Sequence, residues 1–536
     1  MIRKPRVLIV LLLLLLQGLV PARAQTVTPR LVVVLVVDQM RADYLTRYGG
    51  MFEHGLKRLT TGGAWFRNAA YPYFTTVTCP GHTTISTGTL PFHHGMIGNS
   101  WFHRETGKAM TCNEDPGVSE VSYGALKGDS NSAKWMLVPT LAETMRTAGK
   151  GRVATMSIKA RSAIGLAGHQ GDFVTWLDER GAWTTSSAFA EAPVAWFDAF
   201  VKANPIEGDA GKTWERTLPA DRYQYEDDAP GERGAGGWGA TFPHGLGSPG
   251  PVFLLHWLQS PFADEYLERM AEAAVEAMPL GHDAGHTDFL GVSFSTLDVV
   301  GHAYGPRSHE VQDVLVRLDA TIGRLLAFLD AKVGGGDYVL ALSSDHGVAD
   351  IPEQVPGAGR VNVQTLLTTI ETSVKTALGG NGPFVAAING SDVYLTPGTY
   401  GRLEQDPAAL HAVTDAVTNV AGVARVLTSD ELATASARES KDPHLRAAAL
   451  SYFPGRSGDL LIAPKENWIF AGSGTTHGSW YDYDQRVPMI LYGAGIRAGV
   501  QEDAATPADI APTLASVLGI RVQSPDGHVL KPALAQ

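Results

Sequence analysis

Cysteine, basic residues and long apolar runs are all scarce in this chain of 536 residues. The two cysteines, Cys79 and Cys112, can pair in an oxidising compartment or remain two buried thiols, and the sequence leaves both alternatives open. The chain also has no tandem repeat and no long low-complexity tract. A repeat architecture is therefore not expected.

Basic residues are outnumbered, with 43 Lys and Arg against 55 Asp and Glu, which gives a formal net charge of −12. Removal of the basic N-terminal segment described next would take this charge to about −16. Binding to nucleic acid depends on neutralising its phosphates with Lys and Arg, so nucleic acid is not expected as a bulk partner. A phosphate ester can still be attracted if its own site is positive.

The longest apolar run, from Val7 to Leu16, follows the basic residues Arg3, Lys4 and Arg6. It leads to a small-residue exit at Ala22-Arg23-Ala24, which is the pattern of a secretory signal peptide. A bilayer span needs roughly 20 apolar residues, so a retained membrane anchor is the less favoured alternative. The mature chain would not begin with cysteine, which argues against a lipoprotein. We therefore predict a signal peptide at residues 1–24, cleaved after Ala24, and a periplasmic or secreted protein.

Apolar runs typical of buried strands alternate with helical patterns through much of the chain. This alternation predicts an α/β fold, a doubly wound and mostly parallel central sheet with helices on both faces. The clearest helix spans about 310–329, where apolar residues recur every three or four positions. Another helix start is indicated at Thr506-Pro507-Ala508-Asp509, and Val487 to Tyr492 is typical of a late core strand.

Two segments interrupt this alternation. Residues 184–250 are rich in Gly, Pro and Trp with little periodicity, and we interpret them as a loop-rich insertion near a site mouth. Residues 352–472 contain short strands and helices of their own and are predicted to form an inserted cap lobe. The catalytic core would then comprise 25–351 and 473–536, consistent with a mature chain longer than the usual single core of about 250–300 residues.

Residues that bind divalent metals follow several of the predicted strands. Asp38 ends the run Leu31 to Val37, the motif Asp298-x-x-x-His302 follows 289–294, and Asp345-His346 follows 338–342. Ligands of open parallel sheets collect beyond the carboxyl ends of the strands, so these side chains can converge. Aspartate and histidine are ordinary ligands of catalytic zinc. Taken alone, Asp298-x-x-x-His302 is better explained by a helix-capping aspartate beside a surface histidine. Asp345-His346 alone is equally explained by a turn aspartate beside an exposed histidine.

Thr78 precedes a predicted helix that ends near Gly88. We place Thr78 at the helix N-cap, where free backbone N–H groups and the helix dipole favour a phosphate oxygen. A plain capping role is the alternative. His82 is expected to pack behind this helix.

The ordered set of motifs resembles the alkaline phosphatase superfamily. Within it, the chain is similar from about Leu31 to its C-terminal region to the phosphate-irrepressible, PafA-type alkaline phosphatases, relatives of the nucleotide pyrophosphatase/phosphodiesterases. The motifs that carry the resemblance are Asp38, Thr78 within Thr76-Val-Thr-Cys-Pro-Gly-His82, Asn99 within His94-Gly-Met-Ile-Gly-Asn99, Lys159-Ala-Arg161, Asp298-x-x-x-His302, Asp345-His346-Gly347 and His477.

This resemblance implies two Zn²⁺ per chain and a threonine nucleophile. It implies that one zinc is held by Asp298, His302 and His477. The second would be held by Asp38, Asp345 and His346, with the oxygen of Thr78 as a further ligand. Asn99 would donate a hydrogen bond to a phosphoryl oxygen, and Lys159 and Arg161 would bind the remaining oxygens.

Lys159 and Arg161 favour a phosphate monoester because it exposes more charged oxygens than a diester does. Both follow a predicted strand at 153–158, although two solvated surface charges would be the ordinary interpretation of such a pair. A phosphodiesterase or nucleotide pyrophosphatase on the same scaffold is the alternative activity. A sulfatase is disfavoured because Cys79-Pro80-Gly81-His82 lacks the Cys-x-Pro-x-Arg context of formylglycine formation.

The sequence thus predicts an exported phosphomonoesterase that hydrolyses small phosphate monoesters through a covalent phosphothreonine. We expect a monomer without a stable membrane anchor. A catalytically silent protein that retains the metals to bind phosphate or an anionic glycan is the rival from another class. Intact candidates for nucleophile, ligands and oxyanion donors argue against it.

Overall fold

The computed structural model describes residues 28–124, 130–149 and 151–535. The predicted signal peptide at residues 1–24 lies outside this range. None of the helices in the described ranges combines the length and apolarity needed to cross a membrane.

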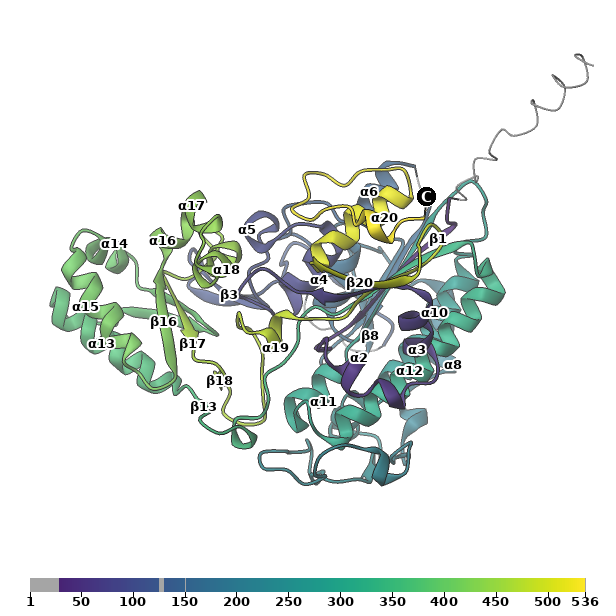
Figure 1. The fold of residues 1–536 in the computed structure, drawn as a ribbon, viewed down its shortest axis with the longest axis horizontal. Coiled ribbons are helices and arrows are strands. Elements are labelled where there is room, and N and C mark those ends of the chain that lie inside the picture. The colour runs from purple at the N-terminus through teal and green to yellow at the C-terminus, as the bar shows by residue number, and fades with distance from the viewer. Residues whose placement is uncertain (1–27, 125–129, 150, 536) are drawn as a thin grey trace, which may run out of the picture.

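A ten-stranded mixed sheet forms the centre of the larger body (Figure 1). Its strands, in spatial order, are β20 (Gly499–Ala505), β2 (Ala64–Ala69), β19 (Met489–Gly493), β12 (Tyr338–Ser343), β1 (Leu31–Val37), β11 (Asp288–Phe294), β6 (Val153–Ser157), β7 (Phe173–Leu177), β8 (Trp183–Ser186) and β5 (Glu120–Ser122).

The middle of the sheet is parallel, from β12 through β1, β11 and β6 to β7. Strand β1 pairs along its length with β11 on one side and β12 on the other, so the carboxyl ends of these three strands lie together. The flanks are partly antiparallel, because β19 runs opposite to β12 and β2, and β8 runs opposite to β7. The late core strand predicted near 487–492 is therefore present as β19, but it is antiparallel.

Strand β1 shows why the central sheet is covered on both faces. Leu31, Val33, Leu35 and Val37 belong to one apolar cluster, whereas the alternate residues Val32, Val34 and Val36 belong to another. Successive side chains of a strand point to opposite faces, so a strand that is apolar throughout must be buried twice. The predicted α/β fold with a largely parallel, doubly covered sheet is confirmed.

The helices divide between these two faces. The first cluster includes apolar residues of α3 (Gly55–Gly62), α10 (Phe262–Ala277) and α12 (His309–Leu329). The second cluster includes residues of α4 (Thr78–Thr87), α6 (Leu141–Thr147), α7 (Ala160–Ala167) and α20 (Ile510–Val517). Helix α12 matches the helix predicted at 310–329, and the capping box at Thr506 precedes α20 through a single 3₁₀ turn at Pro507–Asp509.

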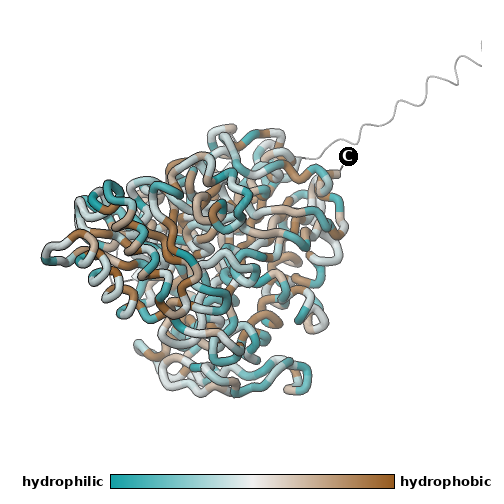
Figure 2. The backbone as a smooth tube through the Cα atoms, turned by 60° about the vertical axis from the view of Figure 1, so that its left-hand side comes forward, coloured by the Kyte–Doolittle hydropathy of each residue, from teal (hydrophilic) through white to brown (hydrophobic). Residues whose placement is uncertain are grey.

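Residues 352–472 contain a second sheet, which forms the green lobe at the left of Figure 1. Its order is β14 (Val385–Asn389), β15 (Asp392–Leu395), β17 (Leu460–Pro464) and β16 (Val423–Thr428). Helices α13 (Val363–Leu378) and α15 (Pro407–Thr418) pack on it around a separate apolar cluster. Figure 2 shows hydrophobic stretches both within this lobe and within the larger body. We call residues 352–472 the cap lobe.

The shorter helices of the cap lobe, α16 (Ser429–Ala433), α17 (Ala435–Arg438) and α18 (Pro443–Ser451), lie on its side toward the larger body. The backbone N–H of Phe74 in the larger body donates to Ala447 O of α18 at 3.0 Å. The Gly-rich segment 184–250 has little regular structure apart from β8, helix α8 (Ala195–Ala203) and a short ladder of β9 (Thr213–Trp214) with β10 (His244–Gly245). Its buried Phe197, Trp214 and Leu246 join the cluster that contains α10 and α12.

Candidate functional site

The predicted metal donors gather where the three central parallel strands end. Asp38 is the first residue after β1, and Asp345 lies two residues after β12. Asp298 lies in the first turn of α11 (Thr296–Tyr304), which begins directly beyond β11. Because these strands are neighbours in register, residues far apart in sequence reach one edge of the sheet.

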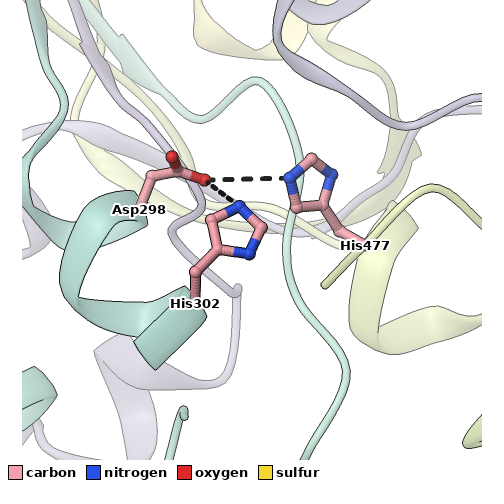
Figure 3. A group of neighbouring side chains, drawn as sticks. All are labelled: Asp298, His302 and His477. Atoms are coloured by element: carbon pink, nitrogen blue, oxygen red, sulfur yellow. Dashed lines mark ion pairs between the residues drawn. The ribbon is translucent and has the colours of Figure 1, made fainter. Parts of the chain in front are cut away.

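The first group of donors is Asp298, His302 and His477 (Figure 3). Asp298 and His302 project from the same face of α11, and His477 approaches from a loop. Nε2 of His302 lies 3.2 Å from Asp298 Oδ1, and Nε2 of His477 lies 3.7 Å from the same oxygen. The three ligand atoms lie within 4.8 Å of one another.

Both imidazoles of this group are oriented by backbone carbonyls. Nδ1 of His302 is 2.8 Å from Thr475 O, and Nδ1 of His477 is 2.9 Å from Thr76 O. A carbonyl oxygen accepts only an N–H, so it fixes the proton on Nδ1 and leaves the Nε2 lone pair free for a metal. The segments that contain Thr76 and Thr475 therefore hold the two rings in a ligating orientation.

The second group is Asp38, Asp298 and His346, whose ligand atoms also lie within 4.8 Å of one another. Nε2 of His346 is 3.4 Å from Asp38 Oδ1 and 3.4 Å from Asp345 Oδ2. The expected members Asp38, Asp345 and His346 are thus adjacent, and Asp298 lies between the two groups. Nδ1 of His346 is 2.9 Å from Gly347 O, which again leaves Nε2 free.

The chemistry of these donors fits a metal ion. Asp38 Oδ1, Asp345 Oδ2 and His346 Nε2 are buried, and within the described ranges none has a hydrogen-bond partner. Buried polar atoms are almost always paired, because an unpaired one loses its hydration without compensation. Both oxygens lie 3.4 Å from the nitrogen, and a cation that all three atoms coordinate would account for this arrangement.

The buried carboxylates of the site repel one another and are stabilised by positive charge. Burial, followed by repulsion from Asp298 and Asp345, raises the pKa of Asp38. Burial would also raise the pKa of Asp298, but attraction to Lys159 and His302 holds it well below its ordinary value. Nζ of Lys159 lies 2.6 Å from Asp38 Oδ2 and 2.5 Å from Asp298 Oδ2. Lys159 therefore forms ion pairs with both carboxylates.

Thr78 lies beside both groups on helix α4, every residue of which is buried. Thr78 is the first helical residue, whereas Val77 occupies the N-cap position that we predicted for Thr78. The hydroxyl is nevertheless on the first turn, where backbone N–H groups are unpaired within the helix. A Cβ added to Gly81 would lie 2.3 Å from Asp345 O, so glycine is what lets α4 pack against the end of β12.

Asn99 lies next to Thr78. Its Nδ2 is 3.5 Å from Thr78 Oγ1, and its Oδ1 accepts a hydrogen bond of 2.8 Å from the backbone N–H of Cys79. The amide is thus oriented with its N–H₂ group toward the threonine hydroxyl. This is the orientation needed by a donor to an oxygen that approaches Thr78.

Lys159 and Arg161 follow β6 at the same edge of the sheet. Lys159 contacts the carboxylates, whereas the buried Nε of Arg161 has no hydrogen-bond partner among the described residues. Both line a cavity of about 530 Å³ together with Asn113 and Trp176. A cavity that contains Lys159 and Arg161, together with Asp178 and Glu179, therefore adjoins the metal donors through Lys159.

Two residues that contact the donors were not assigned to the site by sequence reasoning. Gln39 has a φ of 68°, and its side-chain Nε2 donates to Asp298 Oδ1 at 2.7 Å while its backbone N–H donates to Asp345 Oδ1 at 3.1 Å. His82 was expected only to pack behind α4. Its Nε2 contacts Ser293 Oγ at 2.8 Å, and its Nδ1 lies 3.2 Å from Asp345 Oδ2. Proximity of Gln39 to Asp38 in sequence was the one available signal.

Cys79 and Cys112 are joined by a disulfide. It links the first turn of α4 to the end of the hairpin formed by β3 (Ser100–His103) and β4 (Lys108–Thr111). The alternative of two buried thiols is therefore excluded in this structure. The bond fixes α4 to the loop that contains Asn99, since Cys112 N–H also donates to Asn99 O at 3.0 Å.

The chain is similar to known proteins along most of its length. The family model of type I phosphodiesterase / nucleotide pyrophosphatase matches residues 32–485. Alkaline phosphatase PafA of Elizabethkingia meningoseptica is 32% identical over 538 residues, covering 97% of both chains. A protein of Myroides odoratus named calcium-transporting ATPase is 32% identical over 531 residues and 94% of each chain.

The crystal structure of wild-type PafA superimposes with a TM-score of 0.85 at 30% identity, covering 95% of this chain and 99% of PafA. Similarity of this extent spans both the larger body and the cap lobe. The chain therefore belongs to the type I phosphodiesterase / nucleotide pyrophosphatase family, as one of its PafA-type alkaline phosphatases.

Proposed function

We propose that this protein is an exported two-zinc phosphomonoesterase that works through a covalent phosphothreonine. The observation that carries the proposal is the convergence of two groups of metal donors, sharing Asp298, beside the segment of Thr78, where Thr76 O contacts His477 and His82 of α4 contacts Asp345. The names of the alkaline phosphatase relatives support the reaction class.

The proposed metal ligands are Asp298, His302 and His477 at one site and Asp38, Asp345 and His346, with Thr78 Oγ1, at the other. Two bound Zn²⁺ would lower the pKa of the threonine hydroxyl and stabilise the attacking and leaving oxygens of an in-line displacement. Gln39 positions Asp298 and Asp345 through its two hydrogen bonds. The carbonyls of Thr76 and Thr475 keep the ligating nitrogens of the histidines directed inward.

Thr78 Oγ1 would attack phosphorus, forming a threonine O–P bond while the P–O bond to the alcohol breaks. Asn99 Nδ2 would donate to a phosphoryl oxygen, and Lys159 and Arg161 would balance the charge of the remaining oxygens. The leaving alcohol would take up the proton lost by the Thr78 hydroxyl. A water molecule would then attack the phosphothreonine, releasing inorganic phosphate and giving one of its protons back to Thr78 Oγ1. The poor nucleophilicity of a neutral hydroxyl implies an alkaline activity optimum.

Phosphate monoesters are the proposed substrates because two cations, Lys159 and Arg161, flank the site. A monoester dianion gains more from such a pair than a diester monoanion does. Replacing both residues by Ala should therefore reduce monoester turnover far more than diester turnover. ATP belongs among the substrates tested, since the Myroides relative is named an ATPase and a terminal phosphate suits the same site.

The decisive experiment combines metal analysis of the purified protein with rates on one monoester, one diester and ATP. About two zinc ions per chain and a preference for the monoester would support the proposal. High diester turnover, with monoester turnover unaffected in the Lys159→Ala/Arg161→Ala variant, would identify the phosphodiesterase alternative instead.

Export and oligomeric state complete the proposal. We propose that cleavage after Ala24 gives a mature chain that begins at Gln25, and N-terminal sequencing of protein recovered from the host envelope or medium would test this. All proposed site residues come from one chain, so a monomer is sufficient for activity. Light scattering of the active protein checks that state.

A further inference from the structure

Arg456 is a cation from the cap lobe that lies among three aromatic rings, two of the larger body and one of its own lobe. It lies between α18 and β17. Its guanidinium is 5.4 Å from the ring centre of Trp101, 5.5 Å from that of Trp135 and 5.0 Å from that of Phe453. A guanidinium over a ring within about 6 Å is attracted by the electrons of the ring face.

The same guanidinium donates two hydrogen bonds to the larger body. Nη1 of Arg456 is 2.6 Å from Gly95 O and 2.7 Å from Trp135 O. Burial lowers the pKa of Arg456 to about 10, and no carboxylate among the described residues offsets that effect. A half-buried cation without an anionic partner is costly, so its stabilisation comes from these carbonyls and rings.

Arg456 contacts both ends of the Gly95–Trp101 segment, which contains Asn99. Gly95 precedes Asn99 and accepts the 2.6 Å hydrogen bond, while Trp101 follows Asn99 and supplies one of the three rings. Gly95 has a φ of 78°, and a Cβ there would lie 2.6 Å from Arg456 Nη1. The backbone at residue 95 is therefore shaped to let the guanidinium approach.

The middle of this segment faces the nucleophile. Asn99 Oδ1 accepts from Cys79 N–H, and Asn99 Nδ2 is 3.5 Å from Thr78 Oγ1. A displacement of the segment by a fraction of an ångström would misdirect this amide, because oxyanion donors act only at hydrogen-bond distance. Arg456 itself touches neither Thr78 nor the metal donors.

We propose that Arg456 is a positioning residue of the cap lobe, which holds the Gly95–Trp101 segment so that Asn99 is directed at the oxygen bound beside Thr78. The cap lobe thereby contributes to catalysis without supplying a group that contacts the substrate. This inference rests on the role assigned to Asn99 in the proposed function.

A double-mutant cycle tests the proposal with the full-length metal-loaded protein. The variants are Arg456→Met, which keeps length but loses the donors, Arg456→Lys, Asn99→Ala and each combination with Asn99→Ala. We expect Arg456→Met to lower kcat on a phosphate monoester by about 10- to 100-fold with little change in KM, because a misplaced group costs on that order. Arg456→Lys should recover part of the loss, since it keeps one donor and the charge.

The cycle separates positioning from general destabilisation. If Arg456 acts through Asn99, Arg456→Met should have almost no further effect in the Asn99→Ala background. Arg438→Met is the matched control, because Arg438 of α17 also lies over a ring of the larger body, Phe92 at 5.0 Å, but donates to Ala433 O in its own lobe. It should retain wild-type kcat.

Each outcome decides the proposal. Equal losses from Arg456→Met in the wild-type and Asn99→Ala backgrounds, or no loss in the wild type, would overturn the positioning role alone. Wild-type activity of Asn99→Ala would overturn both this role and the one assigned to Asn99. If Arg456→Met does not fold, Arg456→Lys is judged by the same cycle.

Discussion

The hydroxyl of Thr78 is the one group whose removal should abolish chemistry while leaving the donors intact. We expect Thr78→Ala to lose at least about 1,000-fold in turnover of a phosphate monoester, because the covalent route would be closed. Zinc content should stay close to that of the wild type, since six other ligands remain. The measurements are initial rates and metal analysis on the same preparation.

Thr75→Ala is a suitable control for this experiment. Thr75 lies on the same segment and forms hydrogen bonds through its backbone. Its N–H donates to Ser451 Oγ, and its carbonyl accepts from Val77 N–H. It should retain nearly full activity. Substantial turnover by Thr78→Ala at wild-type zinc content would rule out the phosphothreonine route.

A buried pair outside the two groups of metal donors should influence how stability responds to pH. His244 Nε2 lies 2.8 Å from Glu310 Oε1, and both side chains are fully buried. Burial raises the pKa of Glu310 to about 9 and lowers the pKa of His244 to about 4. Both groups are therefore neutral at pH 7, and the protonated carboxyl of Glu310 can donate a hydrogen bond to the imidazole of His244.

The sign of the effect follows from the raised pKa of Glu310. Its stabilising contribution is fully present below the ordinary carboxyl value and is lost as pH rises from there to about 9, because the unfolded chain releases the proton first. Wild-type Tm should thus fall between pH 7 and 10 by about 2 to 4 °C more than that of Glu310→Gln. Glu353→Gln, at a residue whose pKa is lowered by Arg360, should match the wild type. Parallel curves for Glu310→Gln and wild type would contradict the assignment.

At the scale of elements, the disulfide joins helix α4 to the β3–β4 hairpin. The linked residues are 33 positions apart, and a loop of that size is worth about 3 to 4 kcal/mol through the entropy of the unfolded chain. Reduction with a phosphine reductant should therefore lower the Tm and, through Asn99, also the activity. The Cys79→Ala/Cys112→Ala variant should begin at the lower Tm and show no response to the reductant. Equal Tm values of oxidised and reduced wild type would contradict this role.

The central elements could be predicted from sequence. A strand buried on both faces has a continuous apolar run, as in β1, and a helix buried on one side has an apolar stripe, as in α12. Strand direction could not be predicted, because β19 is equally apolar in either orientation and its direction depends on how the chain returns from the cap lobe. Helix α8, within the Gly-rich segment 184–250, was not predicted. It is only nine residues long, and its apolar face consists of Trp196, Phe197 and Phe200.

The candidate site shows a similar division. Its donors could be predicted because the motifs at Asp298-x-x-x-His302 and Asp345-His346 coincide with strand ends. Gln39 and His82 could not be assigned to the site from sequence. Gln39 reaches Asp345 from the end of a neighbouring strand and His82 reaches it from α4, and both contacts depend on tertiary packing. Pairing of Cys79 with Cys112 also depended on the path of the hairpin. The roles of the individual site residues stay predictions until they are tested.

At the scale of the whole molecule, metal removal should affect stability as well as activity. Asp38, Asp298 and Asp345 are buried together, and without cations their mutual repulsion opposes folding. Ligands that bind only the folded state stabilise it by about 4 kcal/mol at 1,000 times their Kd. Chelation should therefore abolish turnover and lower the Tm, and added Zn²⁺ should restore both. Unchanged activity after exhaustive chelation would refute the metal proposal.

The division into a core of 25–351 and 473–536 with an inserted cap lobe at 352–472 also stays a proposal. It is supported by the separate sheet and separate apolar cluster of the cap lobe. The contacts of Arg456 and of α18 show that the lobe packs against the larger body, which contains the candidate site. Its deletion should therefore reduce activity even if the remaining chain folds.

The donors at the ends of the central strands come from residues 38 to 477, and β19 enters between β12 and β2 only after the last of them. A nascent polypeptide cannot assemble this centre until almost all of it has left the ribosome. The group that includes His477 is therefore completed late, whereas Asp38, Asp345 and His346 all precede the cap lobe in the chain. The proposed function needs both groups, so hydrolysis of phosphate esters would begin only at the end of synthesis.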